Sequence, residues 1–248
     1  MKGIILAAGK GERIKELKIN HKSLAVVQNK RVIDYSLNLL IGNNPDSPLV
    51  DEIIVVVGYN ADAIINYLKE YYKGFPIKYV FQQELLGAAH AIYVAKDLLN
   101  DDFIMCMGDE IMINPRLNKM INEFYYTDAM CVCGTILDGK DYSMKPIAYE
   151  VDNSRNILKV IEKPKLYPND VRGVGECIFQ KKALDYLERL QPNPIRKEYE
   201  IGNWIQMIID SGEKVRFFEL ADAYINVNYA MDIDVANKLL NNLNDSPH

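Results

Sequence analysis

The chain has 248 residues, a formal net charge of −5, and a composition of 49% hydrophobic and 25% charged residues. This composition is typical of a globular protein with one large core, and it argues against a disordered chain. The negative charge argues against a nucleic-acid partner, because a general nucleic-acid-binding protein normally carries a basic patch. No segment approaches the roughly 18 apolar residues of a membrane helix, so we expect no membrane partner and a cytoplasmic location.

In the first half of the chain, short apolar runs alternate with amphipathic segments. The runs are predicted to be buried parallel strands because nothing polar lies on either face; they span Gly3–Ala7, Ile53–Val57, Ile77–Phe81 and Phe103–Met107. Helices are predicted between them, at Val32–Leu40, at Ala61–Tyr72 with Asn60 as the cap, at Ala88–Leu99, and after Asn114 and Pro115. This alternation predicts right-handed βαβ units.

The second half contains more strands and fewer helices. Strands are expected at Ala129–Leu137, Ile147–Asp152, Asn156–Glu162 and Val174–Phe179, with a hairpin turn at Asp152–Asn156. Helices are expected at Lys181–Leu190, Tyr199–Ser211 and Met231–Asn241. We therefore predict an α/β fold: a Rossmann-like, mostly parallel mixed sheet flanked by helices, with a small extra sheet in the C-terminal half.

The four cysteines are expected to be buried thiols of the core. They are Cys106, Cys131, Cys133 and Cys177. Cys131 and Cys133 would share one face of a strand, and the paired C-x₂₋₄-C spacing of zinc sites does not occur.

The residues that follow each parallel strand are the candidates for a site, because ligands bind beyond the carboxyl ends of such strands. The first strand runs into Ala8-Gly9-Lys10-Gly11-Glu12-Arg13, whose small residues allow a ligand to approach backbone amides that can bind phosphate. Arg13 and Lys22 supply cations for a polyphosphate. The loop matches neither the Walker loop nor the dinucleotide-binding fingerprint.

Two later strands also end in residues with useful chemistry. Gly108 and Asp109 follow Phe103–Met107, and a carboxylate at this edge suits a magnesium ion that also binds substrate phosphates. Gln82 follows Ile77–Phe81, and its amide can pair with the edge of a nucleobase that lies against Gly87. His90 is expected to be a structural residue.

In order and spacing, these segments resemble the sugar-1-phosphate nucleotidyltransferase family, and most of all its glucose-1-phosphate thymidylyl- and uridylyltransferases. One motif would mean little, but six in the family's order form a specific signal that extends from residue 1 to about residue 240. The matching segments are Leu6-Ala7-Ala8-Gly9-Lys10-Gly11-Glu12-Arg13 with Lys22, Gln82 with Leu86-Gly87-Ala88-Ala89-His90-Ala91, Gly108-Asp109, Glu162-Lys163-Pro164, Gly173-Val174-Gly175 with Glu200, and Asn226.

The resemblance implies roles for these residues. The loop from Leu6 to Gly11, with Gly108, would bind the nucleotide, and Arg13 would hold its triphosphate. Lys22 would stabilise the charge at the α-phosphorus and on pyrophosphate, while Gln82 and Gly87 would contact the base. Magnesium would be held by Asp109 and Asn226. The acceptor would be bound by Ala148, Glu162, Lys163, Gly175 and Glu200.

The reaction that the resemblance implies is attack by a sugar 1-phosphate on the α-phosphorus of a nucleoside triphosphate, which yields an NDP-sugar and pyrophosphate. The nucleotide would carry a pyrimidine, as in UTP, dTTP or CTP. Catalysis would depend on positioning and charge neutralisation, with magnesium as the cofactor. A single domain over residues 1–248 is expected, with a nucleotide-binding half at about 1–125 and an acceptor-binding half at about 126–243.

Three departures from the family pattern bear on Lys22, on the metal site and on the acceptor, in that order. The loop Ile14–His21 lacks the usual prolines. Asn226 replaces an aspartate, as in acetylglucosamine-1-phosphate uridylyltransferases. Ala148 stands where relatives have a sugar-contacting glycine. A cytidylyltransferase that acts on phosphocholine or a phosphonate is therefore the alternative.

Two other classes of protein fit the sequence less well. A glycosyltransferase of the related fold would need a D-x-D motif, which Met107-Gly108-Asp109-Glu110 does not supply. A regulator without activity would be expected to lack Lys22 or Asp109. A homo-oligomer is left open.

Overall fold

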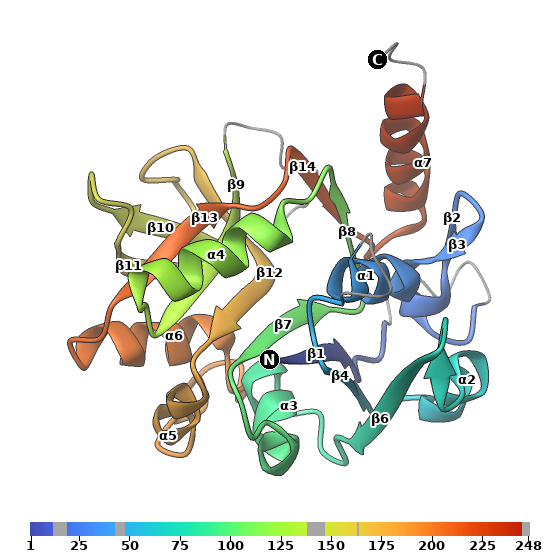
Figure 1. Cartoon of the computed structure of the whole chain (residues 1–248), viewed down its shortest axis with the longest axis horizontal. Helices are drawn as coiled ribbons and strands as arrows, with labels where there is room; N and C mark the ends of the chain where they lie inside the picture. Colours follow the sequence, from blue (N-terminus) through green and yellow to red (C-terminus); the bar gives the residue numbers. More distant parts are fainter. Residues whose placement is uncertain (12–18, 43–47, 138–146, 163, 245–248) are drawn as a thin grey trace.

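A computed structural model describes residues 1–11, 19–42, 48–137, 147–162 and 164–244 (Figure 1). The described chain builds a ten-stranded mixed sheet, two small two-stranded sheets and the helices that cover them. The strands are β1 (Lys2–Ala7), β2 (Val26–Val27), β3 (Lys30–Arg31), β4 (Glu52–Val57), β5 (Tyr71–Tyr72), β6 (Phe75–Phe81), β7 (Phe103–Met107), β8 (Glu110–Ile113), β9 (Cys131–Leu137), β10 (Ile147–Val151), β11 (Ile157–Glu162), β12 (Val171–Phe179), β13 (Val215–Glu219) and β14 (Ala223–Asn226).

Helices connect these strands and pack on both faces of the large sheet. The α-helices are α1 (Val32–Ile41), α2 (Ala61–Leu68), α3 (Ala88–Val94), α4 (Leu117–Thr127), α5 (Leu184–Leu187), α6 (Ile201–Asp210) and α7 (Ala230–Asn244). The described residues also form three 3-10 helices, which are η2 (Lys22–Leu24), η3 (Lys96–Leu98) and η4 (Lys181–Ala183). Among the described helices, none combines the length and the apolar character that crossing a membrane requires.

The first half forms the parallel part of the sheet. β1 lies between β4 and β7 and is parallel to both, and β6 extends the sheet beyond β4. Leu6 lies opposite Val56 on one side and Met107 on the other, so β1, β4 and β7 end at the same edge. This shared edge brings the segments after β1 and β7 together, as parallel strands require.

The second half continues the same sheet through antiparallel pairing. β12 pairs with β7, β9 and β10, and β13 lies parallel to β9. The turn Asp152–Asn156 joins β10 and β11 as predicted, because the Asp152 carboxylate accepts hydrogen bonds from the backbone amides of Ser154 and Asn156, each 2.8 Å long. The predicted mixed sheet flanked by helices, with small additional sheets, is confirmed. The small sheet next to the shared edge pairs β8 with β14 and so joins the two halves.

Alternating side chains of β1 enter the two cores that lie on opposite faces of the sheet. Ile4 and Leu6 join the core covered by α3, α5 and α6. In this core the ring of Trp204 stacks on the ring of Phe179, with 4.3 Å between the ring centroids. Ile5 and Ala7 join the core covered by α1, α2 and α4, two of which cross in front of the sheet in Figure 1. The predicted burial of the cysteines is confirmed, since all four are buried free thiols.

Two predictions in the first half were wrong. The strand at Ile77–Phe81 is not buried on both faces: Phe81 is 50% exposed, because only the short β5 lies beyond β6. The helix that starts at Ala61 ends at Leu68 rather than Tyr72, because Lys69 takes a positive φ of 58° and the chain turns into β5. Asn60 precedes this helix without a capping hydrogen bond from its side chain.

Other helix ends differ by a few residues. The helix after Pro115 starts at Leu117. The segments Ala88–Leu99 and Lys181–Leu190 each split into a short α-helix and a 3-10 turn.

Candidate active site

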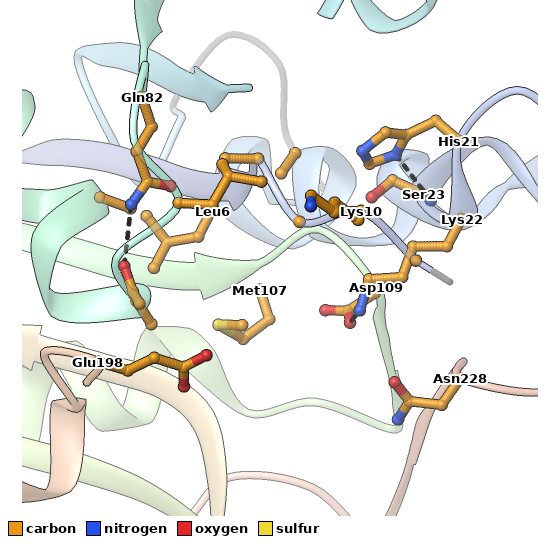
Figure 2. Close-up of a pocket in the computed structure, with 18 residues that line it drawn as sticks. Leu6, Lys10, His21, Lys22, Ser23, Gln82, Met107, Asp109, Glu198 and Asn228 are labelled. Atoms are coloured by element: carbon orange, nitrogen blue, oxygen red, sulfur yellow. Dashed lines mark hydrogen bonds and ion pairs between the residues drawn. The ribbon is translucent and has the colours of Figure 1, made fainter. Parts of the chain in front are cut away.

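The loop after β1 forms one wall of a cavity of about 580 Å³ at the shared edge of the sheet (Figure 2). We call it the nucleotide cavity, after the ligand that the sequence predicts for its residues. The predicted nucleotide residues all line this cavity except Gly108, which lies beneath it. The lining residues among them are Leu6, Ala7, Ala8, Gly9, Lys10, Gly11, Gln82 and Gly87. A Cβ at Gly108 would lie 3.0 Å from the Ala7 Cβ and 3.2 Å from the Leu6 carbonyl oxygen, so glycine allows the two strand ends to meet. Arg13 lies outside the described residues.

An ion pair between Lys22 and Asp109 crosses this cavity. Lys22 begins η2, and Asp109 lies between β7 and β8. The Asp109 side chain is 4% exposed, and its Oδ1 atom is buried with no hydrogen-bond partner among the described residues. The sequence prediction that Lys22 and Asp109 share one site is therefore matched by their placement.

His21 holds the start of η2 in place. Its Nδ1 accepts a hydrogen bond of 3.2 Å from the backbone amide of Ser23. Burial, with a smaller contribution from the neighbouring Lys22, lowers the pKa of His21 to about 4. A neutral imidazole therefore lies beside the Lys22 cation, where a second positive charge would be unfavourable. Sequence analysis assigned no role to His21.

The pairing of β8 with β14 brings Asn226 close to Asp109. Asn226 lies directly opposite Glu110, and the backbone amide of Val227 donates a 2.8 Å hydrogen bond to the Asp109 carbonyl oxygen. The Asn226 side chain is engaged on both sides: its Nδ2 donates to Glu110 Oε1 at 3.0 Å, and its Oδ1 accepts from Asn228 Nδ2 at 2.7 Å.

Asn228, which sequence reasoning missed, lines the nucleotide cavity together with Lys22 and Asp109. Figure 2 shows it on the same side of the cavity as Asp109. Its place is fixed by Asp232, whose carboxylate accepts 2.7 Å hydrogen bonds from the backbone amides of Asn228 and Tyr229 at the start of α7. The sequence did contain a signal for Asn228: it lies two residues after Asn226 and four before Asp232, an aspartate that can cap the start of a helix.

Gln82 lies at the opposite end of the nucleotide cavity. Its side chain is buried, and its Nε2 lies 3.0 Å from the carbonyl oxygen of Gly87 and 3.0 Å from Nδ1 of His90. Gly87 has a φ of 104°, and a Cβ there would lie 2.6 Å from the Tyr199 carbonyl oxygen. Only glycine therefore allows the segment after Gln82 to pack against the chain at Tyr199.

A second cavity of about 230 Å³ adjoins the first and shares Ala88, Met107 and Glu198 with it. Four residues with predicted roles at the acceptor or metal line it: Glu162, Gly175, Glu200 and Asn226. Ala148 is fully buried in β10, and its neighbours Ile147 and Tyr149 line the cavity instead. Lys163 lies outside the described residues.

Arg196 is a further residue that sequence reasoning missed. Its guanidinium forms an ion pair with Glu200 and lies 3.6 Å from Glu162 Oε2. The backbone amide of Gly202 donates to Glu162 Oε1 at 3.1 Å, and Asn193 Nδ2 donates to Glu200 Oε2 at 3.0 Å. One cation therefore compensates two carboxylates at the wall of the second cavity. The signal in the sequence was an arginine four residues before Glu200.

A buried pair of carboxyl groups lies at the second cavity, where Glu110 is part of the lining and Glu176 is buried beside it. Glu110 Oε2 accepts a 2.9 Å hydrogen bond from the backbone amide of Gly175, and burial, with the nearby Asp109, raises the pKa of Glu110 to about 8. Glu176 is 1% exposed, and burial next to Glu110 raises its pKa well above the usual range. Both shifts favour the protonated form of these carboxyl groups, a feature that the sequence did not reveal.

Taken together, a glycine-rich loop at the end of a parallel strand, a lysine–aspartate pair and two adjoining cavities are typical of an α/β enzyme that binds a nucleotide. The chain belongs to the Nucleotidyl transferase family, which it matches over residues 2–236. It is therefore a nucleotidyltransferase, as the resemblance implied.

Similar proteins cover nearly the whole chain. It is 28% identical over 243 residues to a UTP–glucose-1-phosphate uridylyltransferase of Haloferax volcanii, which covers 97% of this chain and 96% of the relative. It is 26% identical over 245 residues to a glucose-1-phosphate thymidylyltransferase of Streptomyces griseus, with 97% of this chain and 66% of that protein covered. The fold is shared with a UDP-glucose pyrophosphorylase solved with UDP-glucose, at a TM-score of 0.83, 16% identity and 98% coverage of each chain.

Proposed function

We propose that this enzyme condenses a pyrimidine nucleoside triphosphate with a sugar 1-phosphate to give an NDP-sugar and pyrophosphate. The observation that carries the proposal is the meeting of two cavities at Met107 and Glu198, one beside the glycine loop and one among carboxylates. The names of the similar uridylyl- and thymidylyltransferases support the same substrates. The proposed halves, at about 1–125 and 126–243, supply most of the first and most of the second cavity, respectively.

Because the two cavities adjoin, an acceptor phosphate in the second could reach the α-phosphorus of a nucleotide in the first. An oxygen of the acceptor phosphate attacks the α-phosphorus, and the bond to the β-phosphate bridging oxygen breaks as pyrophosphate leaves. A phosphate monoester is already an anionic nucleophile, so no strong base is required. We assign Lys22 to the charge that develops at the α-phosphorus, and the backbone of Ala8 to Gly11, with Arg13, to the β- and γ-phosphates.

Magnesium is the proposed cofactor, and the described residues fit it. The Asp109 Oδ1 atom is buried and accepts no hydrogen bond within the described chain, so a cation would satisfy it. The amide nitrogen of Asn228 donates a hydrogen bond to Asn226, so the side-chain oxygen of Asn228 is the atom that could bind an ion in the cavity. Asp109 would hold the ion together with Asn228 or Asn226. A bound ion would supply positive charge against the phosphate oxygens.

We assign the acceptor to the second cavity. Carboxylates such as those of Glu162 and Glu200 accept hydrogen bonds from sugar hydroxyls, and Arg196 and Lys163 would face the acceptor phosphate. Gly175 leaves room at the cavity floor, because a Cβ there would lie 2.7 Å from Glu110 Oε2.

A second candidate acceptor is phosphocholine or a similar aminoalkyl phosphate or phosphonate. The specific observation in its favour is the acidic lining of the second cavity. Four glutamates lie there with three tyrosines, and a cationic head group would suit such a surface: they are Glu110, Glu162, Glu198, Glu200, Tyr149, Tyr199 and Tyr224. Arg196 compensates two of these carboxylates, so the sugar phosphate remains the first choice.

The test is pyrophosphate release with magnesium, using UTP, dTTP and CTP crossed with glucose 1-phosphate, N-acetylglucosamine 1-phosphate and phosphocholine. Turnover with a sugar 1-phosphate is expected. Turnover with phosphocholine alone would replace the first candidate by the second, and release of pyrophosphate with no acceptor would contradict both.

A matched pair of variants ties the activity to the site. Asp109→Asn should abolish magnesium-dependent turnover while the protein stays folded, whereas Asp62→Asn, on the exposed side of α2, should behave as wild type. Normal turnover in Asp109→Asn would remove Asp109 from the proposed metal site.

A further inference from the structure

We propose that His90 is a positioning residue: it fixes the Gln82 amide so that the carbonyl oxygen faces the nucleotide cavity, and the enzyme therefore prefers uracil or thymine to cytosine. This inference rests on the proposed function, since it concerns the base of the nucleotide that the first cavity would hold.

Both N–H groups of the Gln82 amide are used inside the protein. One points to the Gly87 carbonyl oxygen and the other to His90 Nδ1, each at 3.0 Å. The orientation does not depend on telling nitrogen from oxygen, because a carbonyl can only accept. The flipped amide would place its oxygen against the Gly87 oxygen and lose that hydrogen bond.

The Gln82 oxygen is thereby directed to the cavity. No described residue donates a hydrogen bond to Oε1, although the side chain is only 4% exposed. Figure 2 shows the nitrogen on the side of the bond to Gly87 and the oxygen on the side of Leu6, at the end of the cavity away from Asp109. Gln82 lines the cavity, and its oxygen can only accept, so a ligand that donates a hydrogen bond at this point is favoured over one that presents an acceptor.

The bases differ in what they offer to such an oxygen. Uracil and thymine carry a hydrogen on N3 and can donate it to Oε1. Cytosine has a lone pair at N3, so the same placement opposes two acceptors. Cytosine could donate its amino group to Oε1 only if the base moved sideways relative to Gln82. That movement would shift the ribose and the α-phosphate relative to Lys22.

His90 is well held for this task. It lies on α3 near the rings of Tyr93 and Tyr199, whose centroids are 6.4 and 6.0 Å from the centroid of the imidazole. The helix is tied to the same segment, because the backbone amide of Ala89 donates a 3.0 Å hydrogen bond to the Tyr199 carbonyl oxygen. To accept from Gln82 through Nδ1, the imidazole carries its hydrogen on Nε2.

The first experiment measures kcat/KM for UTP, dTTP and CTP with one sugar 1-phosphate, together with calorimetric binding of UTP and CTP in the presence of magnesium. UTP and dTTP are expected to exceed CTP by at least about a hundredfold. Equal or better use of CTP would overturn the base preference while leaving the proposed transfer intact. Preferential binding of UTP without turnover would leave the base preference standing and overturn the transfer, and absence of binding of either nucleotide would overturn both.

The second experiment tests the position of the amide. His90→Phe keeps a ring but removes the acceptor, so the ratio of kcat/KM for UTP over CTP should fall about fivefold, the effect of one neutral hydrogen bond. His90→Gln restores an acceptor and should restore most of the ratio. A purely structural role would lower both rates together, so an unchanged ratio in a folded His90→Phe variant would overturn the assignment.

Discussion

The two adjoining cavities share a wall but are built differently. The nucleotide cavity is lined mainly by β1 and by the segments that follow the parallel strands β1, β6 and β7, and its charged residues are Lys10, Lys22, Asp109 and Glu198, of which Lys22 and Asp109 form an ion pair. The second cavity, which we call the acceptor cavity, is lined mainly by residues of β10, β11 and β12, of α6 and of the segment before α6. Arg196 compensates Glu162 and Glu200 there, and burial favours the protonated form of Glu110. The nucleotide cavity is thus specified by short local segments, whereas the acceptor cavity is specified by contacts between distant parts of the chain.

The segment around Tyr199 connects the two cavities. Its backbone amide donates a 2.7 Å hydrogen bond to the Leu86 carbonyl oxygen beside the base end of the first cavity. Its neighbours Glu198 and Glu200 line the second cavity. The two proposed substrate sites therefore share one continuous stretch of backbone.

The largest effect is expected at the charge pair of the nucleotide cavity. Lys22→Ala should lower kcat by about a thousandfold, because it removes a charge contact to the transition state, equivalent to about 4 kcal/mol. Lys119→Ala, on the exposed side of α4, is the matched control and should retain full activity. Steady-state pyrophosphate release checks both, and a loss below about tenfold at Lys22 would identify it as a surface lysine.

The next effect concerns acid stability and also belongs to the nucleotide cavity. His21 titrates near 6.5 in an unfolded chain but at a pKa of about 4 when folded. The folded state excludes the proton, so this contribution to stability is complete above pH 6.5 and is lost as the pH falls toward 4. The loss is on the order of 3 kcal/mol.

Urea unfolding at pH 7.5 and pH 4.5 measures this loss. Wild type should lose more stability between the two values than His21→Gln, which has no imidazole to protonate. An equal loss in the two proteins would show that His21 is as accessible to protons in the folded state as in the unfolded state.

The acceptor cavity is probed by Arg196→Met. Without the guanidinium, Glu162 and Glu200 repel one another and the acceptor phosphate, so KM for the acceptor should rise about thirtyfold, or about 2 kcal/mol. KM for the nucleotide should change little. Arg189→Met, whose guanidinium lies over the ring of Tyr186, is the control. An equal rise in KM for the acceptor and for the nucleotide would show that Arg196 does not act on the acceptor cavity alone.

Sequence reasoning placed Gly9 and Asp109 at one edge of the sheet because their determinants are local. Each follows a recognisable apolar run, and parallel strands bring such residues together at a shared edge. The role expected of Lys22 came instead from the family resemblance. The buried character of β6 was misjudged, since the composition of a strand does not reveal how many neighbours it has.

The acceptor half was predicted less completely because cross-strand register and side-chain rotation decide it. Asn228 lines the nucleotide cavity, whereas Asn226, the expected metal ligand, lines the second cavity. Arg196 was missed because one of its two partners, Glu162, lies far away in the sequence on β11. The pairing of Glu110 with Glu176 depends on β12 packing against β8, which no local pattern indicates.

The smallest expected effect is at Glu176 and has the opposite pH dependence to His21. In the unfolded chain both glutamates ionise near 4.5, whereas burial and mutual repulsion raise their pKa values in the folded state. Their contribution to stability is thus complete at low pH and is lost as the pH rises through about 8. Glu176→Gln keeps the shape and a donor but needs no proton, so it should stabilise the protein at pH 8 by about 1 kcal/mol and have less effect at pH 5.

Thermal unfolding of wild type and Glu176→Gln at the two pH values checks this, with Glu70→Gln as the exposed control. If Glu176→Gln is no more stable than wild type at pH 8, the buried pair must be ionised and compensated, and the acceptor cavity would then resemble the nucleotide cavity in its electrostatics. If it is more stable at pH 8 alone, the two cavities respond to pH in opposite directions, because one excludes a proton at His21 and the other retains one at Glu110 and Glu176.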